Sequence, residues 1–154
     1  MRKGQQTRAA IVNAALEQAS RAGLEGLTIG ALAEQMHMSK SGVFAHFGSR
    51  EELQIAVLKA YEQRFVDEIL KPSLRRPRGL PRLIAILSQW LDRTVIEAPL
   101  GCIGISDASE YDDRPGAVRE ELVAMIRGWQ QEVSRAIEQA IREGHLDAGT
   151  DLQD

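Results

Sequence analysis

Residues 23–57 read GLEGLTIGALAEQMHMSKSGVFAHFGSREELQIAV, and this stretch decides the fold. Within it, apolar residues recur at helical spacing on both sides of a three-residue interval. Thr28 and Ser39 each stand just before such a run, where a side-chain hydroxyl can accept a hydrogen bond from a free N–H group of the first turn. We therefore predict two short helices, over residues 28–36 and 40–47.

Further helices are predicted on both sides of this pair. Upstream, residues 7–22 place small apolar side chains on one stripe, and Gly23 suits the left-handed residue that ends many helices. Downstream, Ser49 and Glu52 have the spacing of a capping box, which opens a long helix carrying apolar residues as far as Ile69. A tight turn between two short helices, with a third helix ahead of them, is typical of a helix-turn-helix unit.

The rest of the chain also predicts helices, and no alternating β pattern of useful length occurs. Residues 71–82 hold three of the five prolines and indicate a break. A helix follows from about residue 80 to 98, then a short irregular or helical piece over 102–111, then a regular helix from Pro115 to about residue 143. The helix from residue 80 is expected to carry Leu80, Leu83, Ile84, Leu87, Trp90, Leu91, Val95 and Ala98 on one side. We predict an all-α fold.

Composition and charge exclude several classes of protein. With 44% hydrophobic and 27% charged residues, the 154-residue chain is expected to fold rather than to be disordered. The single cysteine, Cys102, excludes an intramolecular disulfide and a multi-cysteine metal site. No secretory signal and no apolar stretch near the ~20 residues of a membrane span is visible, so we expect a cytoplasmic protein without membrane contact.

The charge is unevenly distributed along the chain. Residues 1–60 hold seven Lys or Arg and five Asp or Glu, whereas residues 61–154 hold twelve and seventeen. A positive end on an acidic body fits a protein that presents one face to a polyanion. The predicted helix over 40–47 suits that face, because Ser41, Gly42 and Ala45 are small enough for a close approach to base edges in a major groove ~12 Å wide.

With these motifs, residues 7–60 closely resemble the DNA-binding domain of the TetR/AcrR family of bacterial transcriptional regulators. The resemblance lies in the Gly-Leu-Thr start of the second helix, the His-Phe end of the recognition helix and the Ser-Arg-Glu-Glu-Leu restart. It implies a ligand-responsive transcriptional regulator, expected to be a repressor that a small molecule releases from double-stranded operator DNA.

The same resemblance implies the residues that touch DNA. Base contacts are expected from Lys40, Ser41, Gly42 and Ala45, and phosphate contacts from Thr28, Ser39, Phe44 through its backbone, His46 and Arg50. The chain departs from the family pattern in two places. Phe44 stands where a Tyr is usual, and Gly30 and Ala31 stand where some members place a basic residue. For His46, packing between helices is the alternative role.

The resemblance further implies two domains and an effector. We expect a DNA-binding domain over residues 1–48, a fourth helix from 49 that links the domains, and a helical regulatory domain over 49–154 without the family's last helices. The expected effector-binding residues are Phe65, Trp90, Cys102, Ile105, Tyr111, Met125 and Trp129. Ordinary core packing is an equal alternative for Met125 and Trp129. No cofactor is expected and no metal, since the acidic residues over 107–113 lack the spacing of a calcium loop.

Two-fold assembly is also expected, because one recognition helix reads only a few base pairs. A homodimer sets two such helices ~34–36 Å apart on an inverted repeat. TetR-like proteins dimerise through two helices beyond the long one, and this sequence stops at Asp154 near the expected start of the first. We expect either a truncated chain or an interface supplied by spare apolar positions of the long helix, with self-association weaker than that of full-length relatives.

Two other classes of function compete with this interpretation. An enzyme is disfavoured, because three histidines, one cysteine and no phosphate-binding loop or metal motif leave no catalytic arrangement to place. A helical ligand-binding or interaction protein without DNA binding is the remaining alternative. Salt-dependent binding to duplex DNA would separate it from a regulator.

Overall fold

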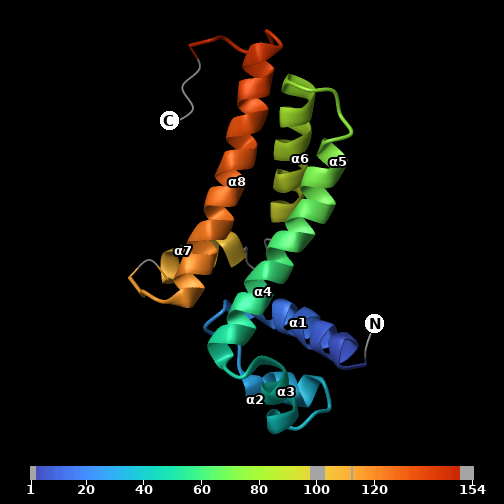
Figure 1. Cartoon of the computed structure of the whole chain (residues 1–154), viewed down its shortest axis with the longest axis vertical. Coiled ribbons are helices and arrows are strands. Elements are labelled where there is room, and N and C mark those ends of the chain that lie inside the picture. Colours follow the sequence, from blue (N-terminus) through green and yellow to red (C-terminus); the bar gives the residue numbers. More distant parts are fainter. Residues whose placement is uncertain (1–2, 98–102, 112, 150–154) are drawn as a thin grey trace. The chain divides into compact units, whose positions relative to one another are not determined.

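The computed structural model describes residues 3–97, 103–111 and 113–149, of which 96, 97 and 104–106 are described by their backbone alone. Within these ranges every regular element is a helix, which confirms the all-α prediction (Figure 1). None of the helices so described is long and apolar enough to cross a membrane. The chain divides into two compact units, Met1–Glu62 with Glu97–Val123 and Gln63–Ile96 with Ala124–Asp154.

The first unit contains the short helices predicted from the opening stretch. Its elements are α1 (Lys3–Ala22), α2 (Ile29–Gln35), α3 (Lys40–Phe47), most of α4 (Arg50–Phe65), α7 (Ile103–Glu110) and the start of α8 (Ala117–Arg142). Helices α2 and α3 pack on each other, and α1 packs on α2. Their buried residues include Ile11, Leu16, Leu32, Val43, Phe47 and Leu53. The helix-turn-helix prediction is thus confirmed as structure.

Local hydrogen bonds explain why these helices begin where they do. The Thr28 hydroxyl accepts from the Ala31 N–H at 3.2 Å, and the Ser39 hydroxyl accepts from the Gly42 N–H at 3.0 Å. The Ser49 hydroxyl accepts from the N–H of Glu52 at 3.0 Å. Each bond satisfies a donor that the first turn of a helix leaves free. All three predicted caps are confirmed.

The second unit contains the C-terminal end of α4, a π-helical turn η1 (Val66–Leu70), α5 (Lys71–Ser73), α6 (Leu80–Glu97) and the rest of α8. The predicted break at Lys71 is too early, because helical structure continues through Pro72 to Ser73. Pro72 has no N–H and its ring crowds the preceding turn, and the wider π turn before it accommodates both. The Lys71 N–H accordingly bonds to the carbonyl of Val66.

The apolar side predicted for helix α6 is covered only in part. Leu83 and Ile86 are buried with Ile69 and Ala136, and Leu80 and Trp90 pack against that cluster. Four large aliphatic residues, Ile84, Leu87, Leu91 and Val95, are exposed. They fall at i, i+3, i+7 and i+11, which defines a second, adjacent stripe on the helix. Ala98 lies outside the described residues.

Helix α8 begins at Ala117, two residues after the predicted start, and ends at Arg142. Its larger apolar side chains are buried or half-buried along the described helix. Trp129, Val133 and Ile137 pack against the buried cluster of the second unit, and an interface supplied by the long helix stays a prediction. In the second unit, the exposed apolar stripe lies on α6.

Candidate nucleic-acid interface

The nine residues expected to touch DNA lie at α3 and at the adjoining starts of α2 and α4. Thr28 and Ser39 are exposed caps, and Lys40, Ser41, Phe44 and Ala45 are exposed along α3. Gly42 and His46 are half-buried, and Arg50 begins α4. The structure therefore gathers all nine within the helix-turn-helix and the residues that follow it. Their contacts with DNA stay a prediction.

The side chain of Lys40 lies over Gly30 at the start of α2. A Cβ atom at position 30 would stand 3.4 Å from Lys40 Cε and 3.6 Å from its Nζ. A side chain at position 30 would therefore touch the end of the Lys40 side chain at ordinary van der Waals distance. The absence of a side chain at Gly30, which departs from some family members, leaves room for the amine of Lys40.

Two further features of α3 suit close contact with a nucleic acid. A Cβ atom at Gly42 would come within 3.1 Å of the Ser39 hydroxyl, so a larger residue would disturb the cap of α3. Phe44 exposes 45% of its surface, although a phenyl ring normally lies inside. An exposed apolar ring on this helix suits contact with a sugar or with the methyl group of thymine.

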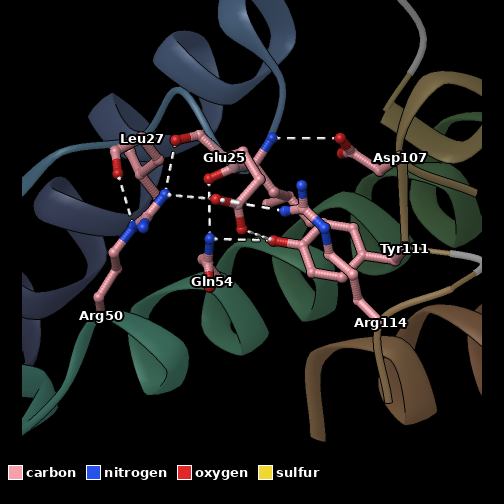
Figure 2. A network of polar contacts seen from close by, with 8 residues as sticks. Glu25, Leu27, Arg50, Gln54, Asp107, Tyr111 and Arg114 are labelled. Carbon is pink, nitrogen blue, oxygen red and sulfur yellow. Dashed lines mark hydrogen bonds and ion pairs between the residues drawn. The ribbon is translucent and has the colours of Figure 1, made fainter. Parts of the chain in front are cut away.

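Arg50 is held by the loop between α1 and α2. Its Nε donates to the carbonyl of Leu27 at 3.1 Å, and its Nη2 donates to the carbonyl of Glu25 at 2.5 Å (Figure 2). Its Nη2 also pairs with the Glu25 carboxylate at 3.3 Å, while 44% of the Arg50 side chain stays exposed. These partners are about 25 residues away along the chain, and no local pattern indicates them.

Glu25 is the centre of a wider polar network in the same unit. The Tyr111 hydroxyl donates to Glu25 Oε1 at 2.6 Å, and Arg114 lies 3.6 Å from Oε2 (Figure 2). Gln54 donates to the Tyr111 oxygen at 3.1 Å and to the carbonyl of Leu24 at 2.8 Å. The Tyr111 hydrogen bond, with the charges of Arg50 and Arg114, lowers the pKa of Glu25 against the opposing effect of its burial.

At two other members of this network burial is the dominant cause, and the pKa is raised. Burial is the largest cause that raises the pKa of Tyr111, and the Glu25 carboxylate adds to it. It also raises the pKa of Asp107 to about 6, aided by the negative charges of Glu110 and Glu25 and opposed by the bond from the Leu24 N–H. That bond spans 3.2 Å to Asp107 Oδ1, and the buried Oδ2 has no partner among the described residues.

The residues expected to bind an effector do not form one group. Three of them, Phe65, Trp90 and Trp129, meet in the second unit. The ring centroid of Trp129 lies 4.6 Å from that of Phe65, in an edge-to-face arrangement, and 5.6 Å from that of Trp90. Met125 is half-buried on α8. Tyr111 belongs to the polar network of the first unit instead. Ile105 is placed in α7 by its backbone alone, and Cys102 lies outside the described residues.

A polar groove on the surface of α8 was not expected. It encloses about 350 Å³ and is lined by Arg127, Gln130, Gln131, Ser134, Arg135 and Glu138. These residues all come from one helix and carry no aromatic ring. Their chemistry differs from that of the aromatic cluster, so the groove does not serve the apolar effector site that the sequence predicts.

Comparison with known families supports the helix-turn-helix. Residues 11–57 match the family described as "Bacterial regulatory proteins, tetR family". Residues 79–154 match the family described as "Tetracyclin repressor-like, C-terminal domain". Together the two matches span most of the chain, and the first contains all nine residues expected at DNA. A search of curated proteins finds no match.

Solved structures share this fold over nearly the whole chain. A TetR transcriptional regulator from Chloroflexus aurantiacus is 29% identical with a TM-score of 0.82, and the match covers 99% of this chain and 77% of that one. FadR from Bacillus subtilis in complex with stearoyl-CoA is 16% identical, with coverages of 94% and 76% and a TM-score of 0.74. AibR in complex with isovaleryl coenzyme A and operator DNA is 21% identical, with coverages of 94% and 77% and a TM-score of 0.73.

Proposed function

Because the chain belongs to the TetR family of bacterial regulatory proteins, we propose that it regulates transcription by placing α3 in the major groove of operator DNA. The observation that carries this proposal is the outer face of α3. Lys40, Ser41 and Ala45 are exposed there together, while Val43 and Phe47 anchor the helix to the core. The resulting surface is small, hydrogen-bonding and positively charged at its leading end.

Roles follow from the chemistry of each side chain. Lys40 and Ser41 are the readers of base edges, and Gly42 and Ala45 allow the backbone of α3 to approach. Thr28, Ser39, His46 and Arg50 bind phosphate, as does Phe44 through its backbone. We propose no catalytic step for this chain, and its action on DNA places it in the cytoplasm.

Salt dependence tests this proposal. Binding of the protein to a labelled DNA duplex is measured over a series of salt concentrations. We expect log K to fall linearly with log salt, by about 0.9 for each phosphate neutralised. Arg50→Ala should weaken binding to all sequences similarly and flatten that slope by at most about 0.9. Absence of salt-dependent binding would favour a helical ligand-binding or interaction protein without DNA binding.

A homodimer on an inverted repeat extends this function. One α3 helix of eight residues reads only a few base pairs, and a two-fold pair doubles the site. The exposed stripe Ile84, Leu87, Leu91 and Val95 on α6 supports the proposal, since apolar side chains in a row favour association with another surface. Sedimentation at micromolar concentration tests it, and a monomer that fails to pair on palindromic DNA contradicts it.

We further propose repression that a small molecule relieves. The aromatic cluster Phe65, Trp90 and Trp129 is the site we favour for that effector, and Met125 precedes Trp129 by one helical turn of α8. Stearoyl-CoA and isovaleryl-CoA, named for two relatives, are suitable first probes. A bound effector should quench the tryptophan fluorescence and weaken DNA binding by about 1–3 kcal/mol, with an equal effect of DNA on the effector. Quenching without any change in DNA affinity would contradict the coupling.

A further inference from the structure

We propose that Glu25 competes with DNA phosphate for the guanidinium of Arg50, and that Tyr111 and Arg114 limit this competition by sharing the Glu25 carboxylate. The inference rests on the proposed function, because it takes Arg50 as a phosphate contact. It assigns positioning roles to three residues, Glu25, Tyr111 and Arg114, that are not among the nine expected to touch DNA.

Different groups hold the Arg50 guanidinium in place and balance its charge. Two backbone carbonyls, of Leu27 and Glu25, accept from Nε and Nη2 and fix the guanidinium at the loop between α1 and α2. Both acceptors are uncharged backbone carbonyl groups. The two hydrogen bonds therefore do not depend on the charge of the Glu25 side chain. The Glu25 carboxylate adds a negative charge 3.3 Å from Arg50 Nη2, and 44% of the Arg50 side chain is still exposed.

A phosphate group would meet the same guanidinium from solvent. Of the five N–H groups of an arginine, those on Nη1 of Arg50 donate to none of the described residues, so they remain for a phosphate oxygen. The nearby Glu25 carboxylate both repels that phosphate and neutralises the cation that would attract it. Glu25 therefore lowers the contribution of Arg50 to DNA binding without displacing it.

The Glu25 carboxylate is divided among three donors. Its Oε1 accepts from the Tyr111 hydroxyl at 2.6 Å, and its Oε2 lies 3.3 Å from Arg50 and 3.6 Å from Arg114 (Figure 2). Tyr111 is fixed in turn by Gln54 of α4 and is buried at the end of α7. If the contact of Glu25 with Tyr111 or Arg114 is lost, its carboxylate interacts more strongly with Arg50. The residues after α7 thus act on the phosphate contact through Glu25.

Glu25→Gln tests the competition, because glutamine keeps the shape and an acceptor for Tyr111 but loses the charge. Glu51→Gln is the matched control, since Glu51 is an exposed carboxylate next to Arg50 with no ion pair among the described residues. Each substitution is made in the native chain and in an Arg50→Ala background. Affinity for a labelled duplex of random sequence is then measured against salt concentration.

We expect Glu25→Gln to tighten binding at low salt by about two- to fivefold and to steepen the salt slope by less than the ~0.9 of one complete phosphate contact. In the Arg50→Ala background this gain should vanish, whereas Glu51→Gln should have the same effect in both backgrounds. Tyr111→Phe and Arg114→Gln should each weaken binding, and should have no further effect when combined with Glu25→Gln. Because Arg114 is exposed, we expect Arg114→Gln to fold normally, so this variant tests the inference even if Tyr111→Phe impairs folding.

Several outcomes would overturn the inference. One is a gain from Glu25→Gln that persists without Arg50, because Glu25 would then act as a general surface charge. Another is a Glu25→Gln variant that binds like the native chain while the native chain still shows salt-dependent binding, which leaves the proposed function standing. If the native chain binds no duplex at any salt concentration, both the inference and the proposed function are wrong.

Discussion

The helix-turn-helix and helix α6 use their apolar residues in opposite ways. Helix α3 turns Val43 and Phe47 into the core and leaves an outer face of small and polar residues with one large apolar side chain, Phe44. Helix α6 buries Leu83 and Ile86 yet leaves four aliphatic side chains in solvent. The first surface suits a hydrated polyanion, and the second suits another apolar surface. In the function that we propose, the first region acts through charge and the second through burial of apolar surface in an assembly.

The largest effect expected on the helix-turn-helix comes from Gly26→Ala. A Cβ atom at position 26 would overlap the carbonyl oxygen of Ala22, so the loop that holds Glu25 and Arg50 must shift. We expect a loss of about 2–4 kcal/mol in the free energy of unfolding, measured by chemical denaturation. Gly4→Ala is the control, because a Cβ atom there meets nothing within 4 Å and alanine favours a helix. Equal stability of the two variants would contradict the role of this loop.

The apolar stripe of α6 is tested by Leu91→Glu. Leu91 is 56% exposed, and Leu74, outside the stripe, is 58% exposed, so Leu74→Glu is a closely matched control. In a two-fold dimer the substitution occurs on both sides of the interface. We therefore expect Leu91→Glu to weaken association by about 2–3 kcal/mol, and Leu74→Glu to leave it unchanged. Sedimentation over a range of concentrations measures the effect. The same dissociation in both variants would show that the stripe has no special part in assembly.

Lys40→Ala sharpens the comparison on the DNA side. We expect affinity for a specific duplex to fall by about 1–3 kcal/mol, with weaker preference at one or two base pairs of each half-site. Competition between duplexes that differ at single base pairs measures the change. A variant that loses affinity equally for every sequence would make Lys40 a phosphate contact rather than a reader of bases. Folding and self-association should be unchanged, because Lys40 is exposed.

Asp107→Asn should make the first unit more stable at neutral pH. Burial raises the pKa of Asp107 from its usual 3.8 to about 6, so the folded chain binds this proton more tightly than the unfolded chain. Asp107 therefore destabilises the fold increasingly as the pH rises from about 4 to about 6. The asparagine variant should gain about 1–2 kcal/mol at pH 7 and little at pH 4. A difference between variant and native chain that does not change with pH would contradict this assignment.

The parts of the site that the sequence predicts are those fixed by contacts within one helical turn. Ser39 caps α3 at Gly42 and Thr28 caps α2 at Ala31, and both bonds follow from residue type at a spacing of three. The hold on Arg50 could not be predicted, because Leu27 and Glu25 reach it only after α1, α2 and α4 have packed. Its partners are ordinary loop carbonyls, which carry no sequence signal.

Helix α6 shows the corresponding limit for packing. Leu83 and Ile84 are equally apolar neighbours, yet one is buried and the other exposed. Periodicity gives the width of an apolar surface but not which part of it a neighbouring helix covers. For the same reason the sequence does not distinguish the surroundings of Tyr111 from those of Trp129. Both are aromatic residues of the second half of the sequence, and only the folded chain assigns them to different units.

Selection of duplexes from a random-sequence pool tests the central claim most directly, because it requires α3 to read bases and the protein to bind as a pair. We predict enrichment of an inverted repeat whose half-sites lie about one helical turn, or ~34–36 Å, apart. Affinity for the enriched duplex should exceed that for the starting pool by at least about 10³ at physiological salt. A pool that stays unenriched after repeated rounds would contradict the account.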